Sequence, residues 1–413
     1  MKPSPGDFHE IRISDHPEPG RYRAHRDAGL IHEAFKRGER DNRTIVYDYA
    51  YMDNHVFPAI GDSPFASLAR ELRGLTFHAE TGELLSRPYQ KFFNAGEREE
   101  TLAMNLPLAD SHLVLEKLDG SMIHAFAQPD GAITFATRWG VSKIAQQALA
   151  WYESEDGAGA GRAALRDLIV AGLTPIFEWT SPDNIVVVRH ETPSLTLTGL
   201  RRRETGALIA YDDLAAHARR LRVPLVRAFD PVADWDSFAA AAMAETEGEG
   251  YVVRFADGHM VKVKNALYAR VHKFKACLAQ PKDAAEIVVS GAVDDMLPHL
   301  SLVERGRIEA YRDLLRGRLR AWAEVVSEAV ERARGGIEMD DPRERQKIFW
   351  MSYASPLGPL LSTCAADAWL GRRDPLEAVE ALVLKNVASN ARFDRFASDL
   401  GLPTLEFGFD SDQ

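Results

Sequence analysis

The sequence predicts an α+β fold with antiparallel sheets, followed by an all-helical C-terminal domain. Up to about residue 275, short apolar runs alternate with turn signals, which is typical of β-hairpins. Beyond that point the turn signals fade and apolar residues recur at helical spacing. With 413 residues the chain is long enough for two domains with separate cores. We therefore expect one domain over residues 1–275 and a second over 276–413.

The individual elements follow from the same signals, taken in chain order. The hairpin turns are expected at Thr81-Gly82, Pro129-Asp130-Gly131, Glu204-Thr205-Gly206 and Ala256-Asp257-Gly258. Helices are predicted near 143–152, 161–170 and 211–220, where apolar spacing changes from two to about 3.6 residues. In the last part, a helical stripe is formed by Ile308, Tyr311, Leu315, Leu319, Trp322, Val326 and Val330.

Composition indicates an ordinary globular protein and argues against two classes of site. Only Cys277 and Cys364 are present, too few for a disulfide framework or a four-cysteine zinc site. No run of residues is long and apolar enough to cross a membrane, and the start, Met1–Asp7, lacks the apolar core of a secretory signal. We therefore expect a cytoplasmic protein of a bacterial or phage-infected cell, without a membrane partner.

The charge distribution is more informative than the total. A net charge of −11 counts against a protein that simply coats nucleic acid, because such binding depends on cations placed against phosphates. Cations nevertheless gather between Arg254 and Lys275, and a second cluster is formed by residues 201–203. Such clusters are usually solvated surface. In Lys262-Val263-Lys264, however, strand alternation places both lysines on one face, so that they converge.

The segment 116–121, Glu-Lys-Leu-Asp-Gly-Ser, places Lys117 just before an Asp-Gly turn between two strand-like runs. Lys-x-Asp-Gly alone is weak, because it arises by chance about once in ten chains of this length. Its position relative to other charged residues is the stronger signal. Glu178 ends an apolar run, Glu249 precedes Gly-Tyr-Val-Val, and the lysine pair follows.

This order of charged residues resembles the covalent lysine nucleotidyltransferases, which include ATP-dependent RNA and DNA ligases and messenger-RNA capping enzymes. Further segments resemble one branch, the T-even phage RNA ligase 1 type, from about Val46 to His272. These segments are Arg73-Gly74-Leu75-Thr76-Phe77, Ser86-Arg87-Pro88, Lys91-Phe92-Phe93-Asn94, Arg203-Glu204-Thr205-Gly206 and Tyr211-Asp212-Asp213. The resemblance implies a nucleotidyltransferase (ATP-grasp-like ligase) domain with antiparallel sheets, followed by the helical domain.

The resemblance also implies a reaction, the ATP-dependent joining of an RNA 5′-phosphate to a 3′-hydroxyl. Lys117 would form a lysyl-AMP, which passes AMP to the RNA before the ends are sealed. A free lysine has a pKa of about 10.4, so attack on ATP requires something that favours loss of its proton. Neighbouring cations, partial desolvation and a divalent metal, Mg²⁺ or Mn²⁺, would all do so.

Matching the motifs one by one assigns further roles. Lys262 and Lys264 are the expected catalytic contacts to the α-phosphate, and Glu178 the expected contact to the ribose. Glu249 is the expected metal-facing carboxylate, and Asp119 is expected to organise the turn and also to face the metal. The remaining nucleotide contacts implied by the resemblance are Arg73, Lys91, Glu116, Gly120, Arg138 and Tyr268.

At three positions that match the family, the residues themselves leave the assignment open. Phe93 and Tyr268 match aromatic positions of the family, but a buried aromatic is more often part of the core, so both readings stay open. Arg138 fits a basic position of the family, which is more often followed directly by glycine. Here Trp139 stands before Gly140, so the register of Arg138 is open by one residue.

Alternative functions share most of these residues. A DNA ligase or a GTP-using capping enzyme usually adds an OB-fold after the last motif, which the helical pattern does not resemble. A non-catalytic RNA-binding relative would be expected to lose the nucleophile or a carboxylate. The resemblance further implies RNA repair with nicked transfer RNA as the substrate of the helical domain, a possible end-healing kinase or phosphatase partner, and a monomer.

Overall fold

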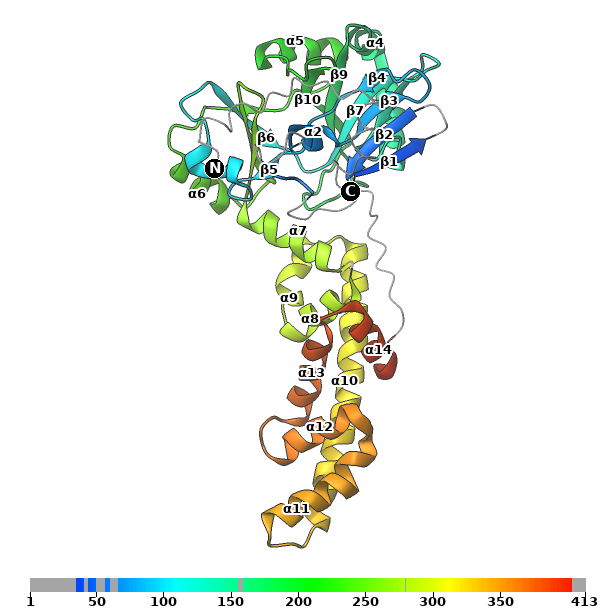
Figure 1. Ribbon diagram of the computed structural model, residues 1–413, viewed down its shortest axis with the longest axis vertical. Coiled ribbons are helices and arrows are strands. Elements are labelled where there is room, and N and C mark those ends of the chain that lie inside the picture. Colours follow the sequence, from blue (N-terminus) through cyan, green and yellow to red (C-terminus); the bar gives the residue numbers. More distant parts are fainter. Residues whose placement is uncertain are drawn as a thin grey trace. The chain divides into compact units, whose positions relative to one another are not determined.

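The computed structural model describes residues 35–40, 44–49, 56–59, 66–154, 159–278 and 280–402 (Figure 1). The start of the chain at Met1–Asp7 lies outside these ranges. The described residues divide into two compact units between Arg270 and Val271. The first unit is mixed and the second contains only helices, so the predicted α+β class and all-helical C-terminal region are confirmed.

The first sheet of the mixed unit is antiparallel and has the strand order β1-β2-β3-β4. Its strands are β1 (Phe35–Arg40), β2 (Thr44–Tyr49), β3 (Leu75–His78) and β4 (Leu84–Ser86), with the short helix α2 (Ala66–Glu71). Every described side chain of β2 is buried. Ile45, Leu72 and Phe77 form the centre of its core.

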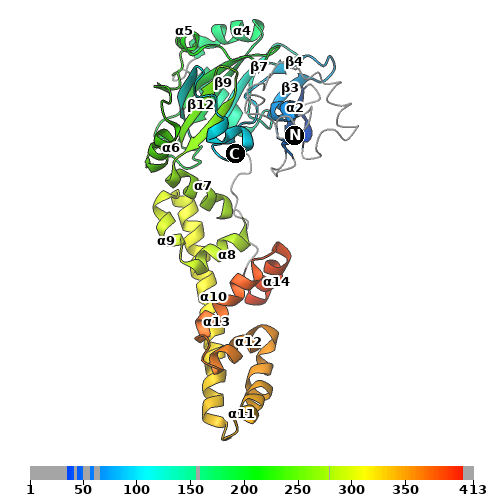
Figure 2. The same ribbon diagram turned by 60° about the vertical axis from the view of Figure 1, so that its left-hand side comes forward.

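The second sheet is antiparallel in the order β10-β9-β7-β8. It consists of β7 (Ser121–Ala127), β8 (Ile133–Ala136), β9 (Leu173–Thr180) and β10 (Ser194–Arg202). The helices α3 (Lys143–Glu153), α4 (Arg162–Val170) and α5 (Tyr211–Leu221) share its apolar core, and Figure 2 shows α4 and α5 together beside this sheet. The three helices begin and end within about one residue of the predicted positions.

The third sheet has the order β11-β6-β12-β13-β5, and only the β13–β5 pair is parallel. Its strands are β5 (Phe93–Asn94), β6 (His112–Lys117), β11 (Ala228–Phe229), β12 (Gly250–Phe255) and β13 (Met260–Lys264). The short turns η2 (Glu99–Thr101) and η3 (Ala103–Asn105) follow β5, and α6 (Trp235–Ala244) packs on β12 and β13. Gly250 lies opposite Lys117 on one side and Lys264 on the other.

A buried ionic network holds distant segments of the mixed unit together. Arg201 Nη2 lies 2.7 Å from Glu71 Oε1, and Arg87 Nε lies 3.0 Å from Glu71 Oε2. Both arginines are fully shielded from solvent, and Glu71 is 4% exposed. The interpretation of residues 201–203 as a solvated basic cluster is therefore wrong for Arg201, because its charge is paired with Glu71 inside the fold.

The helical unit is built around one long helix, α10 (Leu302–Gly336). Ser301 caps it and forms a capping box with Glu304, two polar contacts that satisfy free backbone N–H groups. The predicted apolar stripe of α10 is buried except at Trp322, which is half-buried. The other helices are α7 (Ala266–Leu278, shared with the first unit), α8 (Pro281–Ser290), α9 (Val293–Met296), α11 (Pro342–Phe349), α12 (Gly358–Trp369), α13 (Pro375–Asn386) and α14 (Asn390–Leu400).

Between α11 and α12 the chain forms a short π-helix, η6 (Trp350–Ala354), and a 3-10 turn, η7 (Ser355–Leu357). Another 3-10 turn, η5 (Leu297–His299), precedes α10. None of the helices in the described ranges has the length and apolar character needed to cross a membrane.

Candidate active site

Lys117 is the last residue of β6, and the tight turn 118–120 connects it to β7 in the next sheet. A Cβ on Gly120 would come within 2.3 Å of the carbonyl oxygen of Trp179 and 2.9 Å of the Thr180 side chain. Only glycine therefore allows the turn to pack against β9. This contact fixes the backbone that directly follows the lysine.

Glu249 joins two of the predicted lysines. Lys117 Nζ donates to Glu249 Oε2 at 2.6 Å, and Lys264 Nζ lies 3.0 Å from Oε1. Glu249 is only 3% exposed. Burial alone would raise the pKa of this carboxyl, but the charges of the two lysines lower it overall. The carboxylate is therefore ionised at neutral pH and holds both ammonium groups.

The next residue, Gly250, explains how these groups come so close. Its φ is +130°, and a Cβ would lie 2.1 Å from the carbonyl oxygen of Val263. Because β12 lies between β6 and β13, the missing side chain lets the three strand ends approach. Glu249 thus supplies the carboxylate for both lysines, and Gly250 lets the strands that carry them lie close together.

Lys262 points from the same face of β13 as Lys264, as strand alternation predicts. Its ammonium lies 4.6 Å from the centre of the Phe92 ring. Burial lowers the pKa of Lys262 well below its ordinary value, and the charges of Lys91, Lys117 and Arg73 lower it further. Within the described ranges it has no ion-pair partner. Lys117 and Lys264 share the single carboxylate of Glu249, so this face carries excess positive charge suited to a phosphate.

The carboxylate of Asp119 is fully engaged by the protein itself. One oxygen accepts from the backbone N–H groups of Val187 and Val188 at 2.7 and 2.5 Å, and the other accepts from the Tyr268 hydroxyl at 2.7 Å. The backbone oxygen of Asp119 lies 2.9 Å from His190 Nε2. These contacts support the turn-organising role, whereas the metal-facing role stays a prediction.

Two further predicted cations lie near the lysine cluster. Arg73 Nη1 lies 2.9 Å from Met122 Sδ and 3.4 Å from the carbonyl oxygen of Tyr89. Lys91 lies over the rings of Tyr49 and Phe93, at 5.2 and 5.3 Å from their centres. Burial lowers the pKa of Lys91. The charge of Arg73 lowers it further, whereas Tyr49 raises it.

Arg138 is held by the first sheet. Its Nη1 lies 2.8 Å from Asp48 Oδ2, and its guanidinium lies 4.7 Å from the Tyr49 ring and 4.1 Å from the Trp139 ring. Arg138 therefore already has a carboxylate partner. Its role in nucleotide binding stays a prediction.

Three predicted positions are buried or face the other side of the sheet from Lys117, and their nucleotide contacts stay predictions. Phe93 is 2% exposed and belongs to the core, as the packing interpretation expects. Tyr268 is also buried, with its ring 4.9 Å from the Lys264 ammonium and its hydroxyl on Asp119. Glu116 alternates with Lys117 along β6, so its side chain faces the other side of the sheet, 3.6 Å from Arg227.

Glu178 lies across from Met122 in the second sheet and is half-buried. Burial raises the pKa of Glu178 from 4.5 to about 7, with Lys117 opposing and Glu249 and Asp119 adding to the increase. Glu178 is therefore within electrostatic reach of the nucleophile and the turn. The structure brings it to the same cluster as Lys117, Glu249, Lys262 and Lys264.

Glu178→Gln is expected to weaken the pH dependence of stability. The native protein holds this proton between pH 4.5 and about 7 while the unfolded chain releases it, so the free energy of unfolding falls as pH rises through that window. The melting temperature of the variant minus that of wild type should therefore be higher at pH 8 than at pH 5. Melting temperatures at both pH values provide the measurement.

Exposed Glu191 provides the matched control, because Glu191→Gln removes a carboxylate of ordinary surroundings. Asp48, whose pKa burial raises to about 7 against the charge of Arg138, stays in every protein compared and contributes equally. If Glu178→Gln and Glu191→Gln track wild type in parallel at both pH values, Glu178 ionises normally in the fold.

Several residues of this region carry no local sequence signal. Met122, Tyr49 and Asp48 contact predicted cations, and Asn265 accepts from the backbone N–H of Tyr268 at 2.6 Å. Phe92 belongs to the segment 91–94 that resembles the family, but the sequence does not predict that its ring lies beneath Lys262. Among the described residues, no group of three or more His, Cys, Asp or Glu side chains is arranged to hold a metal ion.

Comparison with known proteins supports the resemblance inferred from the motifs. A family model described as RNA ligase matches residues 71–268. A putative RNA ligase of Thermovibrio ammonificans is 34% identical over 248 residues, which is 56% of this chain and 59% of that protein. This chain therefore spans less than two thirds of the length of that relative.

Two further matches complete the comparison. RNA ligase 1 of bacteriophage TS2126 is 29% identical over 296 residues, covering 69% of this chain and 68% of the phage protein. An archaeal ATP-dependent RNA ligase of known structure aligns over 95% of this chain and 89% of its own, with 14% identity and a TM-score of 0.44. The family match includes the turn at Lys117, Glu178, Glu249 and the lysine pair. Residues 71–268 of this chain are therefore similar to the RNA ligases of the T4 RNA ligase 1 type.

Proposed function

We propose that this protein is an ATP-dependent RNA ligase that joins a 5′-phosphate to a 3′-hydroxyl through a lysyl-AMP. The observation that carries the proposal is the contact of Lys117 and Lys264 with the single buried carboxylate of Glu249, inside a segment that matches an RNA ligase family model. A lysine fixed at a strand end, with excess positive charge beside it, suits attack on a phosphate ester.

In the first step the Lys117 amine attacks the α-phosphorus of ATP, a phosphorus–nitrogen bond forms, and pyrophosphate leaves. The amine must first give up a proton, and Lys262, Lys264 and Arg73 are the cations gathered beside it. The same cations offset the negative charge that develops on the α-phosphate. Glu178 is proposed to bind the ribose.

Two transfers to RNA follow in the same place. A 5′-phosphate oxygen of RNA attacks the adenylate, which breaks the bond to Lys117 and forms a pyrophosphate linkage between AMP and the RNA. A 3′-hydroxyl then attacks the RNA phosphate, loses its proton and expels AMP. Lys262 and Lys264 are proposed to contact phosphate in each step, since both point from one strand face.

A divalent cation, Mg²⁺ or Mn²⁺, would neutralise phosphate charge and orient the leaving group when bound. Glu249 is the proposed protein ligand, because it is an ionised carboxylate in contact with the nucleophile. The hard oxygen chemistry of a carboxylate fits either cation. Phosphate oxygens and water would supply the remaining ligands.

The experiment is transfer of label from [α-³²P]ATP to the protein with Mg²⁺, followed by addition of 5′-phosphorylated RNA without further ATP. A ligase of this class should first carry the label itself and then release it as AMP on sealing the RNA. Parallel reactions with GTP, NAD and 5′-phosphorylated DNA test the capping and DNA-ligase alternatives. No covalent label with any nucleotide would reject the proposal and favour a non-catalytic RNA-binding protein.

Nicked transfer RNA is the natural substrate that we propose, with the helical unit contributing to its selection. The support is the presence of a large all-helical unit beyond the family match. Removing residues from 276 onward should lower sealing of a nicked anticodon loop much more than sealing of a plain oligonucleotide. Equal losses on both substrates would contradict this choice of RNA.

A further inference from the structure

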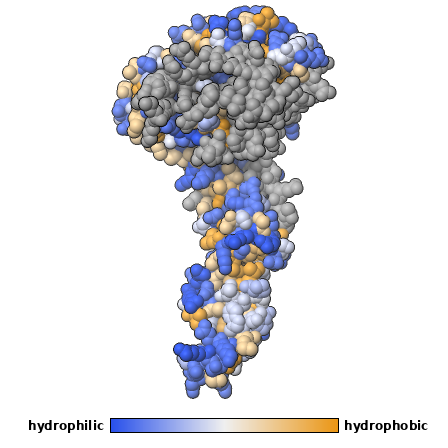
Figure 3. All heavy atoms as spheres, viewed as in Figure 1, coloured by the Kyte–Doolittle hydropathy of each residue, from blue (hydrophilic) through white to orange (hydrophobic). Residues whose placement is uncertain are grey.

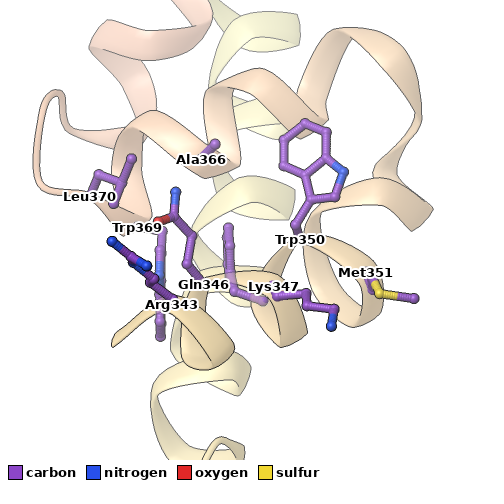
Figure 4. A pocket seen from close by; sticks show the side chains of 9 residues that line it. Arg343, Gln346, Lys347, Trp350, Met351, Ala366, Trp369 and Leu370 are labelled. Carbon is purple, nitrogen blue, oxygen red and sulfur yellow. The ribbon is translucent and has the colours of Figure 1, made fainter. Parts of the chain in front are cut away.

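The helical unit contains a cavity of about 360 Å³ formed by α11, the π-helix η6 and the end of α12 (Figure 4). Phe349 and Ala366 belong to its lining, and Phe349 is buried in the unit. Pockets for small ligands begin at roughly 300 Å³, so this volume suits one flat ring system better than an extended ligand. All of its lining residues come from the helical unit.

Aromatic side chains dominate the cavity. Trp369 stacks on Phe349 with ring centres 4.5 Å apart and planes nearly parallel at 4°. Trp350 is 44% exposed and Met351 is 65% exposed, unusual for large apolar side chains beside a cavity. Figure 4 shows the Trp350 indole on the other side of Gln346 from Trp369. A flat apolar ligand would therefore find exposed aromatic surface that the fold leaves uncovered.

The rim of the cavity is positively charged. Arg343 and Lys347 line it, and Arg345 lies 5.3 Å from the Trp369 ring. Hydrophilic residues also gather around α11 on the face that Figure 3 presents.

Three acidic side chains on or beside α11 and α12 have partners within the unit. Glu344 pairs with Lys347 at 3.7 Å, and Asp341 accepts from the backbone N–H of Arg343 at 2.8 Å as a helix cap. Asp367 on α12 pairs with Arg372 and Arg373. Both members of the Glu344–Lys347 pair are more than half exposed, so water screens that interaction and a phosphate can compete for the lysine.

We propose that this cavity binds one unpaired nucleotide of the RNA substrate, which rests on the proposed ligase function and extends it. The base lies against Trp350, and the flanking phosphate is held by Arg343 and Lys347. Gln346 contributes an amide with both a donor and an acceptor for the edge of the base. Exposed aromatic surface combined with cations is the arrangement by which proteins capture single-stranded nucleic acid.

The charges favour RNA over other occupants of an apolar hollow. An apolar segment of another protein would gain nothing from two cations and an amide at the rim. A second copy of the chain would have to bring these same cations close to each other across a twofold interface. A polyanion with flat bases satisfies both the aromatic and the charged groups at once.

The test is binding of a fluorescent single-stranded RNA decamer with blocked ends, which cannot be sealed, measured by anisotropy on the full-length protein. Trp350→Ala and Trp350→Leu should weaken binding by about 5- to 100-fold, the range reported for loss of base stacking. Trp350→Phe keeps a ring and should stay near wild type. The double variant Arg343→Gln/Lys347→Gln should reduce the slope of log K against log salt by roughly 1 to 1.5.

Leu384→Ala is the matched control, because Leu384 is 51% exposed on α13 and does not line the cavity. Binding of Trp350→Ala and Trp350→Leu within twofold of wild type would overturn the proposal. So would a changed sedimentation coefficient of Trp350→Ala with unchanged RNA affinity, which would indicate an interface between copies. Self-adenylation, measured on the same variants, should equal wild type. If neither wild type nor any variant is labelled, the ligase function is rejected. The anisotropy result would still show whether the cavity binds RNA.

Discussion

Lys117→Ala is expected to abolish transfer of AMP from ATP to the protein, with a loss of more than about 10³-fold. The amine is the only group at the end of β6 that can form the covalent bond, and its position depends on the turn at Gly120. Gel detection of labelled protein after incubation with [α-³²P]ATP and Mg²⁺ gives the measurement. Sealing of pre-adenylated RNA should survive in part, because that step needs no lysine nucleophile.

Two controls separate chemistry from charge. Lys117→Arg keeps a cation beside Glu249 but supplies no nucleophilic amine, so it should also fail to take up label. Lys143→Ala changes an exposed lysine at the start of α3 and should label normally. Undiminished labelling of Lys117→Ala would assign the covalent bond to another residue.

Glu71→Ala is expected to destabilise the mixed unit by about 3–5 kcal/mol, the usual effect of removing one partner from a buried ion pair. The substitution would leave Arg87 and Arg201, both fully buried, without their shared carboxylate. Burial alone would raise the pKa of Glu71, but the charges of the two arginines hold it below its ordinary value. Urea unfolding followed by tryptophan fluorescence measures the change.

Glu191→Ala serves as the control, since Glu191 is exposed and should change the free energy of unfolding by less than about 0.5 kcal/mol. Glu71→Gln keeps the shape of the side chain and should lie between Glu71→Ala and wild type. An unfolding midpoint of Glu71→Ala equal to that of Glu191→Ala would mean that the buried network contributes no stability.

Local structure was predictable wherever the signal is local. The helix α3 begins after Ser142, whose side chain accepts from the N–H of Ala145, and its apolar residues recur at helical spacing. The predicted stripe of α10 is likewise buried, because a long amphipathic helix needs one apolar face against its neighbours. The strand order of the three sheets was not predictable, since β6 pairs with β12 more than a hundred residues later.

The site shows the same division between local and distant information. The motifs indicated Lys117, Glu249, Lys262 and Lys264, and the structure brings these four together. Strand alternation alone predicts that the Glu116 side chain lies on the opposite side of the sheet from Lys117, because neighbouring residues of β6 face opposite sides. The burial of Arg201 could not be inferred, because its partner Glu71 lies 130 residues earlier and carries no motif of its own.

The bond between Lys117 and Glu249 has a consequence for the order in which ligands arrive. On the proposal that Glu249 holds the divalent cation, that cation would compete with the ammonium group that donates to the same carboxylate at 2.6 Å. Nucleotide that drew Lys117 toward its α-phosphate would free that carboxylate oxygen, and Glu249 would then be able to hold the cation. Each ligand thus removes the obstacle to the other, which is heterotropic cooperativity, and by linkage the gain in affinity must be equal for both. The metal and the nucleotide would then occupy this protein as a pair.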